Sequence, residues 1–230
     1  MKCKVLYKTK TMKTLQITLT HQFKQYWLLF ALAVFCLALL LVRAKITQDI
    51  YFFFLIWNLF LAYTPLALSA LMMQRLNLIE KPLYFYPLLA CWLLLLPNAP
   101  YLITDFIHLK REAGIPFWFD VLLLISFSAC GLLFGLASMK NIYNILAVKF
   151  STKIASLSMT VTCLLCGFGL YLGRFLRYNS WDILQRPIEL STDIFWSLIA
   201  ADTYRAAWGI TLGFGTFMLL LFSLYNDPEK

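Results

Sequence analysis

The sequence contains few charged residues. Aspartate, glutamate, lysine and arginine together make up 13% of its 230 residues, whereas apolar residues make up 61%. Soluble domains contain about a quarter charged and about half apolar residues. A chain of this composition has too much apolar surface for one water-soluble core, so lipid must cover part of that surface. The composition therefore excludes an ordinary soluble domain and indicates an integral membrane protein in a lipid bilayer.

Several motifs of well-understood chemistry are also missing. The chain has no P-loop, no H-E-x-x-H zinc motif, no G-x-S-x-G nucleophile motif and no dinucleotide fingerprint. It has two histidines, His21 and His108, and His21 lies in a lysine-rich N-terminal arm. Histidine-dependent chemistry outside that arm therefore depends on His108.

The net charge of +9 would suggest nucleic-acid binding in a soluble protein. Here the excess lysines lie mostly beside apolar runs, where they attract anionic lipids and orient the chain in the membrane. No basic groove pattern is present. The sequence therefore predicts no nucleic-acid partner.

Six apolar runs are close to the length that crosses a bilayer as a helix. The third is short and ends at Pro97-Asn98-Ala99-Pro100, where two prolines discourage a straight helix. Residues 101–109 have the pattern of a short amphipathic helix at or dipping into the membrane surface, and 193–205 fit a second such helix or an early start to the last span. The sequence thus predicts an all-α integral membrane protein, a bundle of about six transmembrane helices with one or two short interfacial helices. The runs lie near residues 26–42, 50–73, 83–97, 119–138, 154–173 and 206–225.

The distribution of lysine and arginine indicates the orientation of the bundle. These residues are concentrated in the N-terminal arm and in the loops at 74–82 and 139–153, whereas most acidic residues fall on the opposite side. The positive-inside rule therefore predicts that both termini are cytoplasmic. We expect a basic cytoplasmic arm at 1–25, a six-span membrane domain at 26–226 and a short cytoplasmic tail at 227–230.

Three of the apolar runs contain glycine pairs at four-residue spacing. Small residues at this spacing let helices approach closely, either within one bundle or in a helix-mediated oligomer. The pairs are Gly131 with Gly135, Gly169 with Gly173, and Gly209 with Gly213.

Three polar clusters fall on the predicted extracytoplasmic side, and the first follows the two prolines. If this segment is helical, Asp105 and His108 are three residues apart and share a face. A carboxylate and an imidazole so placed can bind a divalent metal or act as an acid–base pair. The alternative is that Asp105 fixes one histidine tautomer and caps an interfacial turn.

The second and third clusters contain further charged residues. Asp120 lies in the first turn of the fourth span, where the helix dipole favours a negative charge, although a ligand or base role is the alternative. Arg174 and Arg177 lie at the end of the fifth span on one predicted helical face. They could bind a phosphate or carboxylate together, and the alternative is that they anchor the helix at the membrane surface. Asp182 follows and can reach back to an arginine. Asn58, within the second span, favours an interhelical hydrogen bond over contact with a substrate.

These clusters resemble a known group of proteins. The resemblance is to the bacterial membrane-protein family called domain of unknown function 1361, and it covers roughly residues 30–225. It implies a multi-pass protein of the bacterial plasma (inner) membrane, and it brings no catalytic residues because the family has no established activity. The runs that carry it are Pro97-Asn98-Ala99-Pro100-Tyr101, Thr104-Asp105, His108-Leu109, Phe119-Asp120 and Tyr171-Leu172-Gly173-Arg174 through Asn179-Ser180-Trp181-Asp182.

The concentration of polar groups on one membrane face leads to our main hypothesis from the sequence. We expect an extracytoplasmic site that binds or processes an anionic lipid-linked or envelope substrate. Arg174 and Arg177 would hold the anion. Acid–base groups or ligands for a divalent metal would come from Asp105, His108, Asp120 and Asp182, with Asp105 and His108 as the metal pair. The site would be shaped by Asn98, Pro100, Tyr101, Thr104, Asn179 and Trp181.

Two other classes of function stay open, as does whether the protein is an enzyme. A transporter or channel for a small solute would explain the interrupted third span and predicts a water-filled path to both faces. A non-catalytic membrane assembly partner would instead dock another protein through the glycine faces and the outer motifs.

Overall fold

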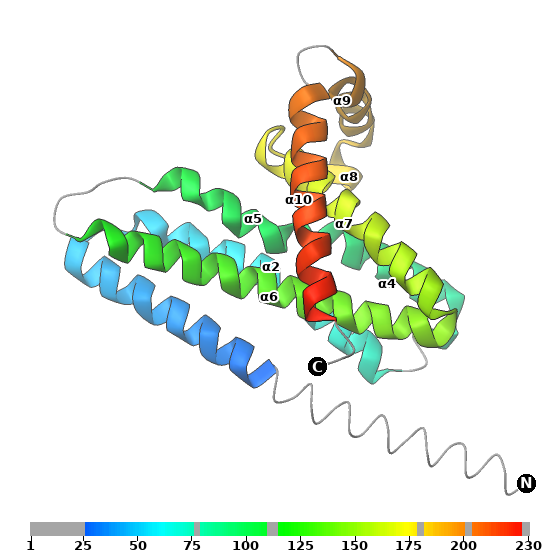
Figure 1. Cartoon of the computed structure of the whole chain (residues 1–230). Coiled ribbons are helices and arrows are strands. Elements are labelled where there is room, and N and C mark those ends of the chain that lie inside the picture. Colours follow the sequence, from blue (N-terminus) through cyan, green and yellow to red (C-terminus); the bar gives the residue numbers. More distant parts are fainter. Residues whose placement is uncertain (1–25, 76–78, 110–114, 179–181, 201–203, 227–230) are drawn as a thin grey trace, which may run out of the picture.

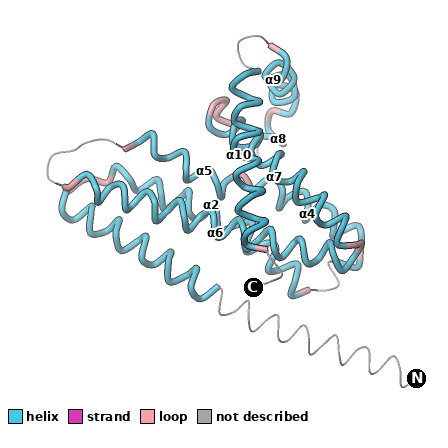
Figure 2. Tube along the Cα trace, viewed as in Figure 1, coloured by secondary structure: helices cyan, strands magenta, loops and turns pink. Residues whose placement is uncertain are grey.

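The computed structural model describes residues 26–75, 79–109, 115–178, 182–200 and 204–226. Within these ranges the chain forms helices joined by short turns, and none of the described residues lies in a strand (Figure 2). The protein is therefore an all-α membrane bundle, as predicted. The expected basic arm at 1–25 and tail at 227–230 lie outside the described residues.

Six helical segments in the described part of the chain are long and apolar enough to cross a membrane. Each expected run overlaps one of them. The short helices α8 (Asp182–Gln185) and α9 (Pro187–Ile199) lie between the last two spans. The six segments are the first helix (Tyr26–Thr47), η1 with α2 (Tyr51–Phe53 and Phe54–Gln74), α4 with α5 and η2 (Pro82–Leu95, Asn98–Thr104 and Asp105–His108), α6 (Phe117–Lys149), α7 (Thr152–Arg174) and α10 (Tyr204–Tyr225).

The bundle is organised around α6, the most buried of the six spans. The first helix, α2 and α5 lie along its N-terminal half, and α7 and α10 pack against each other beside its other half (Figure 1). Large apolar side chains such as Leu28, Leu83, Leu157 and Leu224 point outwards from the helices. Exposed apolar surface on this scale is covered by lipid rather than water.

Successive spans alternate in direction, and the ends that follow one direction form two groups, one at the left and one at the top of Figure 1. The end of α7 joins the two groups, because Arg174 contacts His108 of η2 and Tyr178 contacts Asp193 of α9. Together the two groups hold the start of α2, the end of η2, the start of α6, the end of α7 and the start of α10, together with α8 and α9. We call this the polar end. It collects the segments in which the sequence placed its three polar clusters.

The third span breaks after Leu95, and α5 continues between α2 and α6. A Cβ atom on Gly131 would lie 3.0 Å from the carbonyl oxygen of Ala99, and one on Gly135 would lie 2.7 Å from the Ala99 Cβ. Side chains at these positions would push α5 away, so this glycine pair does mark helix packing within the bundle. The structure packs α5 against α2 and α6, and the position of residues 101–109 at the membrane surface stays a prediction.

The other two glycine pairs have different surroundings. Gly169 of α7 faces Pro97, whose Cγ would lie 2.5 Å from an added Cβ, and Gly173 faces an aromatic ring of α5 at 3.5 Å. Gly209 and Gly213 of α10 have no heavy atom of the described residues within 4 Å of such a Cβ. Packing between subunits through that last pair stays a prediction.

Candidate functional site

The guanidinium of Arg174 is the centre of a polar cluster at the polar end. Arg174 is the last residue of α7, and its side chain reaches across to α5 and η2. Its Nη1 donates to the Tyr101 hydroxyl at 3.1 Å, and its Nη2 donates to the Thr104 carbonyl at 2.9 Å. Its Nη1 also lies 3.4 Å from Asp105 Oδ1 in an ion pair. One arginine thus joins the end of α7 to the third span.

The Asp105 carboxylate is buried and has partners on two sides. Besides the contact with Arg174, its Oδ2 accepts a hydrogen bond from Asn58 Nδ2 at 2.9 Å. A carboxylate removed from water needs such partners because its desolvation is otherwise unfavourable by several kcal/mol. The predicted interhelical hydrogen bond of Asn58 is therefore confirmed, and it ties α2 to the cluster.

His108 contacts Arg174 with one ring nitrogen and Tyr51 with the other. The Nε2 atom lies 3.3 Å from Arg174 Nη2, and Nδ1 lies 3.4 Å from the Tyr51 hydroxyl. A guanidinium can only donate, so Nε2 accepts and the ring hydrogen is on Nδ1. The group that orients the imidazole on this side is thus Arg174, where the sequence had suggested Asp105. We call Asn58, Tyr101, Asp105, His108 and Arg174 the Arg174 cluster.

The predicted metal pair, Asp105 and His108, meets a competing cation in this geometry. The Arg174 guanidinium contacts Asp105 at 3.4 Å and His108 at 3.3 Å, so a divalent ion between them would be repelled by its charge. Among the described residues, no group of three or more histidine, cysteine, aspartate or glutamate side chains is placed to hold a metal. A metal at this pair stays a prediction, and the donor set does not favour it.

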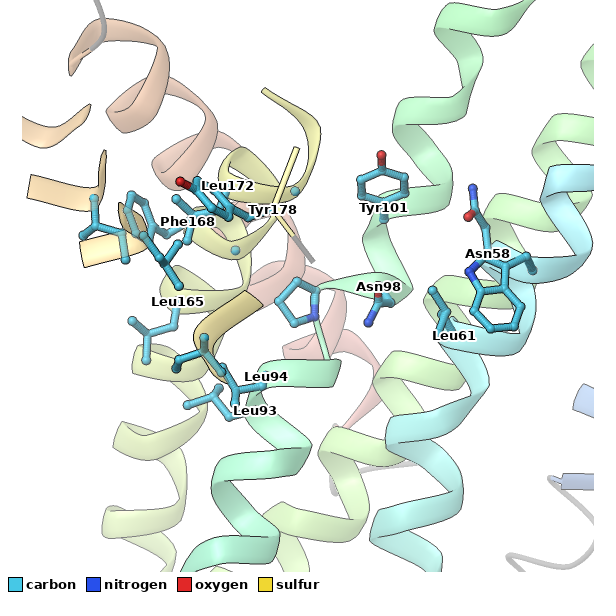
Figure 3. Close-up of a pocket in the computed structure, with 17 residues that line it drawn as sticks. Asn58, Leu61, Leu93, Leu94, Asn98, Tyr101, Leu165, Phe168, Leu172 and Tyr178 are labelled. Atoms are coloured by element: carbon cyan, nitrogen blue, oxygen red, sulfur yellow. The ribbon is translucent and has the colours of Figure 1, made fainter. Parts of the chain in front are cut away.

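A cavity of about 480 Å³ lies beside the Arg174 cluster, between α2, α4, α5, α7, α8 and α9. In Figure 3 Asn58, Asn98 and Tyr101 lie on one side of it, and apolar residues of α7 such as Phe168 and Leu172 lie on the other. Its volume falls in the range of about 300–1,000 Å³ that is usual for small-molecule sites. Asn58 and Tyr101 belong both to the cavity wall and to the cluster. The cluster therefore supports the polar wall of the cavity from behind.

Helix α9 forms the outer wall of the cavity. Its residues Leu190 and Ile194 line the cavity, as does Tyr178 from the segment after α7. The Tyr178 hydroxyl donates to Asp193 Oδ2 at 2.7 Å and so holds α9 against the end of α7. This hydrogen bond to a carboxylate raises the pKa of Tyr178 to about 12. The tether is thus intact throughout the physiological pH range.

The model of a family described as "Protein of unknown function (DUF1361)" matches residues 57–221. The chain belongs to the DUF1361 family. The match begins in α2 and includes the cavity and the whole Arg174 cluster, whereas the first helix and Tyr51, which contacts His108, lie outside it. No curated protein and no solved structure was found to match the chain.

In this DUF1361 protein Asp120 belongs to a separate ion pair. Nε of Arg43 donates to Asp120 Oδ1 at 2.7 Å and Nη2 to Oδ2 at 3.4 Å, with both side chains buried. The guanidinium also lies 4.3 Å from the centre of the Phe52 ring. The carboxylate predicted as a catalytic group or ligand therefore holds the first helix against α6. The sequence missed Arg43 because the apolar run ends at Val42, whereas the helix continues to Thr47.

The remaining predicted residues have mixed outcomes. Helix α7 ends at Arg174, and Arg177 has a left-handed backbone (φ 59°) and an exposed side chain, so the predicted helical face does not extend to Arg177. Asp182, at the start of α8, is buried and lies 3.4 Å from Arg186. Pro100 is buried in α5. Asn179 and Trp181 lie outside the described residues.

Proposed function

We propose that this DUF1361 protein binds an amphipathic membrane lipid or lipid-linked substrate in the cavity beside the Arg174 cluster. The observation that carries the proposal is the pairing of two unlike walls, one apolar and one hydrogen-bonding, in one cavity. The apolar chain of the ligand would lie against α7 and α9. Its head would lie against Asn58, Asn98 and Tyr101.

The position of the cavity along the spans supports a site on one side of the membrane. Its walls come from the first turns of α2, the last turn of α4 in the middle of the third span, and the second half of α7, so the cavity extends from the polar end to the middle of the spans. A solute pathway would need lining groups towards both ends of the spans. The lysine and arginine distribution supports an extracytoplasmic position for the polar end.

The outer surface of α9 supports a ligand that comes from lipid. While Leu190 and Ile194 face the cavity, Ile188, Phe195 and Trp196 on the same helix are 81%, 57% and 58% exposed. An amphipathic helix with aromatic residues on its outer face is typical of the membrane interface. The cavity wall would then be in contact with lipid, and a lipid would reach the cavity without passing through water.

Binding, rather than catalysis, is the role that the described geometry supports. Of the Arg174 cluster, only Asn58 and Tyr101 are among the described residues that line the cavity. Asp105, His108 and Arg174 lie behind them and act as positioning residues. Acid–base chemistry by Asp105 or His108 would require a ligand to pass Tyr101.

Photo-crosslinking tests this proposal directly. The protein is reconstituted in phosphatidylcholine nanodiscs with a diacylglycerol that carries a diazirine in one acyl chain, and the labelled peptides are mapped by mass spectrometry. We expect strong labelling of α7 and α9 residues at the cavity. Leu165→Trp, which places a larger side chain at the cavity wall, should reduce this labelling several-fold.

The matched control is Leu157→Trp. Leu157 lies on the same helix, is 67% exposed and does not line the cavity. It should leave cavity labelling unchanged. Labelling spread evenly over the lipid-facing helices, with no response to Leu165→Trp, would overturn the proposal.

A further inference from the structure

The two amides in the cavity wall have orientations that their partners fix. Asn58 Nδ2 donates to the Asp105 carboxylate at 2.9 Å, and Asn98 Nδ2 donates to the Leu95 carbonyl at 2.8 Å. A carbonyl and an ionised carboxylate can only accept, so the nitrogen of each amide must face them. Each amide therefore presents an oxygen that these bonds do not use, and this oxygen accepts hydrogen bonds from a ligand.

Towards a ligand, one of the two tyrosine hydroxyls in the wall can donate a hydrogen bond and the other can only accept one. The Tyr101 hydroxyl accepts from Arg174 Nη1 at 3.1 Å, which leaves its own hydrogen for a ligand. The Tyr178 hydroxyl donates its hydrogen to Asp193 at 2.7 Å, which leaves only its lone pairs. The wall thus offers three acceptor oxygens beside one hydroxyl donor. Ionised phosphate and carboxylate groups only accept, whereas an alcohol both donates and accepts.

The charges around the cavity do not favour an anion. The guanidinium of Arg174 is engaged by Tyr101, Thr104, Asp105 and His108. Its Nε is buried and has no hydrogen-bond partner among the described residues, and Arg174 is not among the described residues that line the cavity. An anionic head would therefore have to draw Arg174 away from the buried Asp105, which would leave that carboxylate without its cation. The described charges at the polar end balance and give no excess of positive charge: six cations, Arg43, Lys45, Arg174, Arg177, Arg186 and Arg205, against six carboxylates, Asp49, Asp105, Asp120, Asp182, Glu189 and Asp193.

From these donors, acceptors and charges we infer that the ligand is a lipid with an uncharged, hydroxyl-bearing head, of the chemical class of diacylglycerols and glycosyl-diacylglycerols. The inference rests on the proposed lipid-binding function and narrows its substrate class. Head hydroxyls donate to the oxygens of Asn58, Asn98 and Tyr178 and accept from Tyr101. The anionic head that the sequence suggested would meet no lysine or arginine among the described residues that line the cavity.

Competition against the photoreactive diacylglycerol tests the head group. The competitors are dioleoylglycerol, monoglucosyl-dioleoylglycerol, dioleoyl-phosphatidic acid and dioleoyl-phosphatidylethanolamine, each titrated in the same nanodiscs. We expect the two hydroxyl-bearing neutral lipids to suppress cavity labelling at about tenfold lower concentration than phosphatidic acid, the effect of one or two hydrogen bonds.

Two substitutions test whether side chains of the cavity wall cause the preference for neutral lipids. Tyr101→Phe removes one hydroxyl and keeps the ring beside Arg174, so the preference should fall while the photoprobe still labels the cavity. Asn98→Leu removes one acceptor and should lower the preference in the same direction. Two substitutions are used so that a folding defect in one does not decide the result.

The outcomes separate this inference from the function on which it rests. Absence of cavity labelling by any probe would overturn both. Cavity labelling that phosphatidic acid or phosphatidylethanolamine suppresses best would keep lipid binding and overturn the neutral head. A preference for neutral lipids that neither variant changes would also overturn it, because the named groups would not be the ones that recognise the head.

Discussion

Arg43 and Arg174 each place a guanidinium against one buried carboxylate from another helix. Arg43 joins the first helix to Asp120 of α6, and Arg174 joins α7 to Asp105 of the third span. Charged groups are costly within or near a bilayer, so each ion depends on its partner. The two pairs differ in exposure, because the Arg43 pair is almost completely buried whereas the Arg174 side chain is 14% exposed. The first pair is therefore structural, and the second borders the cavity.

Removing one ion of the Arg43–Asp120 pair should destabilise the protein strongly. Asp120→Asn leaves the Arg43 charge buried without compensation, and such a loss costs about 3–5 kcal/mol. Replacing both residues by apolar ones, Arg43→Met with Asp120→Leu, should cost less than the sum of the single changes. The free energy of unfolding is measured by denaturation in mixed detergent micelles.

The control is Glu189→Gln, which disrupts an exposed contact with Arg186 at 3.6 Å. Exposed ion pairs contribute about 0–1 kcal/mol, so this change should be close to neutral. If Asp120→Asn is as mild as the control, the Arg43–Asp120 pair does not stabilise the bundle.

At the scale of single residues, the sequence identified the candidate residues better than it identified the partners that they contact. Asp105, His108 and Arg174 do meet, and Asn58 does make an interhelical bond. Asp120 was assigned to the same site because nothing in the spacing distinguishes a carboxylate that faces the first helix from one that faces α7. That distinction depends on how the helices rotate against each other.

At the scale of elements, small residues decide where the broken third span lies. The backbone of α5 approaches α6 at Gly131 and Gly135 closely enough that added Cβ atoms would clash with Ala99. This contact carries Tyr101 and Asp105 to the positions from which they meet Arg174. The sequence showed three glycine pairs with the same spacing, but spacing alone does not reveal which neighbour, if any, fills each one.

Gly131→Ala and Gly209→Ala form a matched test of this packing. Both glycines are helical, but an added Cβ would collide with α5 at Gly131 and meet nothing within 4 Å at Gly209. Gly131→Ala should destabilise the protein by about 1–3 kcal/mol through overpacking. Gly209→Ala should be neutral or stabilise it by up to about 1 kcal/mol, because alanine favours a helix more than glycine does.

Thermal unfolding in detergent measures both variants against the parent. Equal effects would show that the α5–α6 contact is not limiting. A loss confined to Gly209→Ala would point instead to a contact between copies of the chain at α10.

At the scale of the whole molecule, the six described spans alternate in direction, so the start of the first helix and the end of α10 lie on the side away from α8 and α9 (Figure 1). The number and positions of the spans were predictable from hydropathy because each apolar run is close to the bilayer thickness. The cavity was not predictable, since its described walls come from six helices whose relative positions hydropathy does not reveal.

The charge distribution predicts that the polar end is extracytoplasmic, and cysteine labelling in intact bacterial cells checks this. Glu189 on α9 and Lys153 at the start of α7 are both exposed, and each is replaced by cysteine. Because α9 lies beside the end of α7, the two positions are at opposite ends of this span. A membrane-impermeant maleimide should label Glu189→Cys in intact cells and Lys153→Cys only after permeabilisation, with the parent protein as the background. The reverse pattern would place the cavity on the cytoplasmic side, because α9 forms its wall. The proposed ligand would then have to come from the inner leaflet.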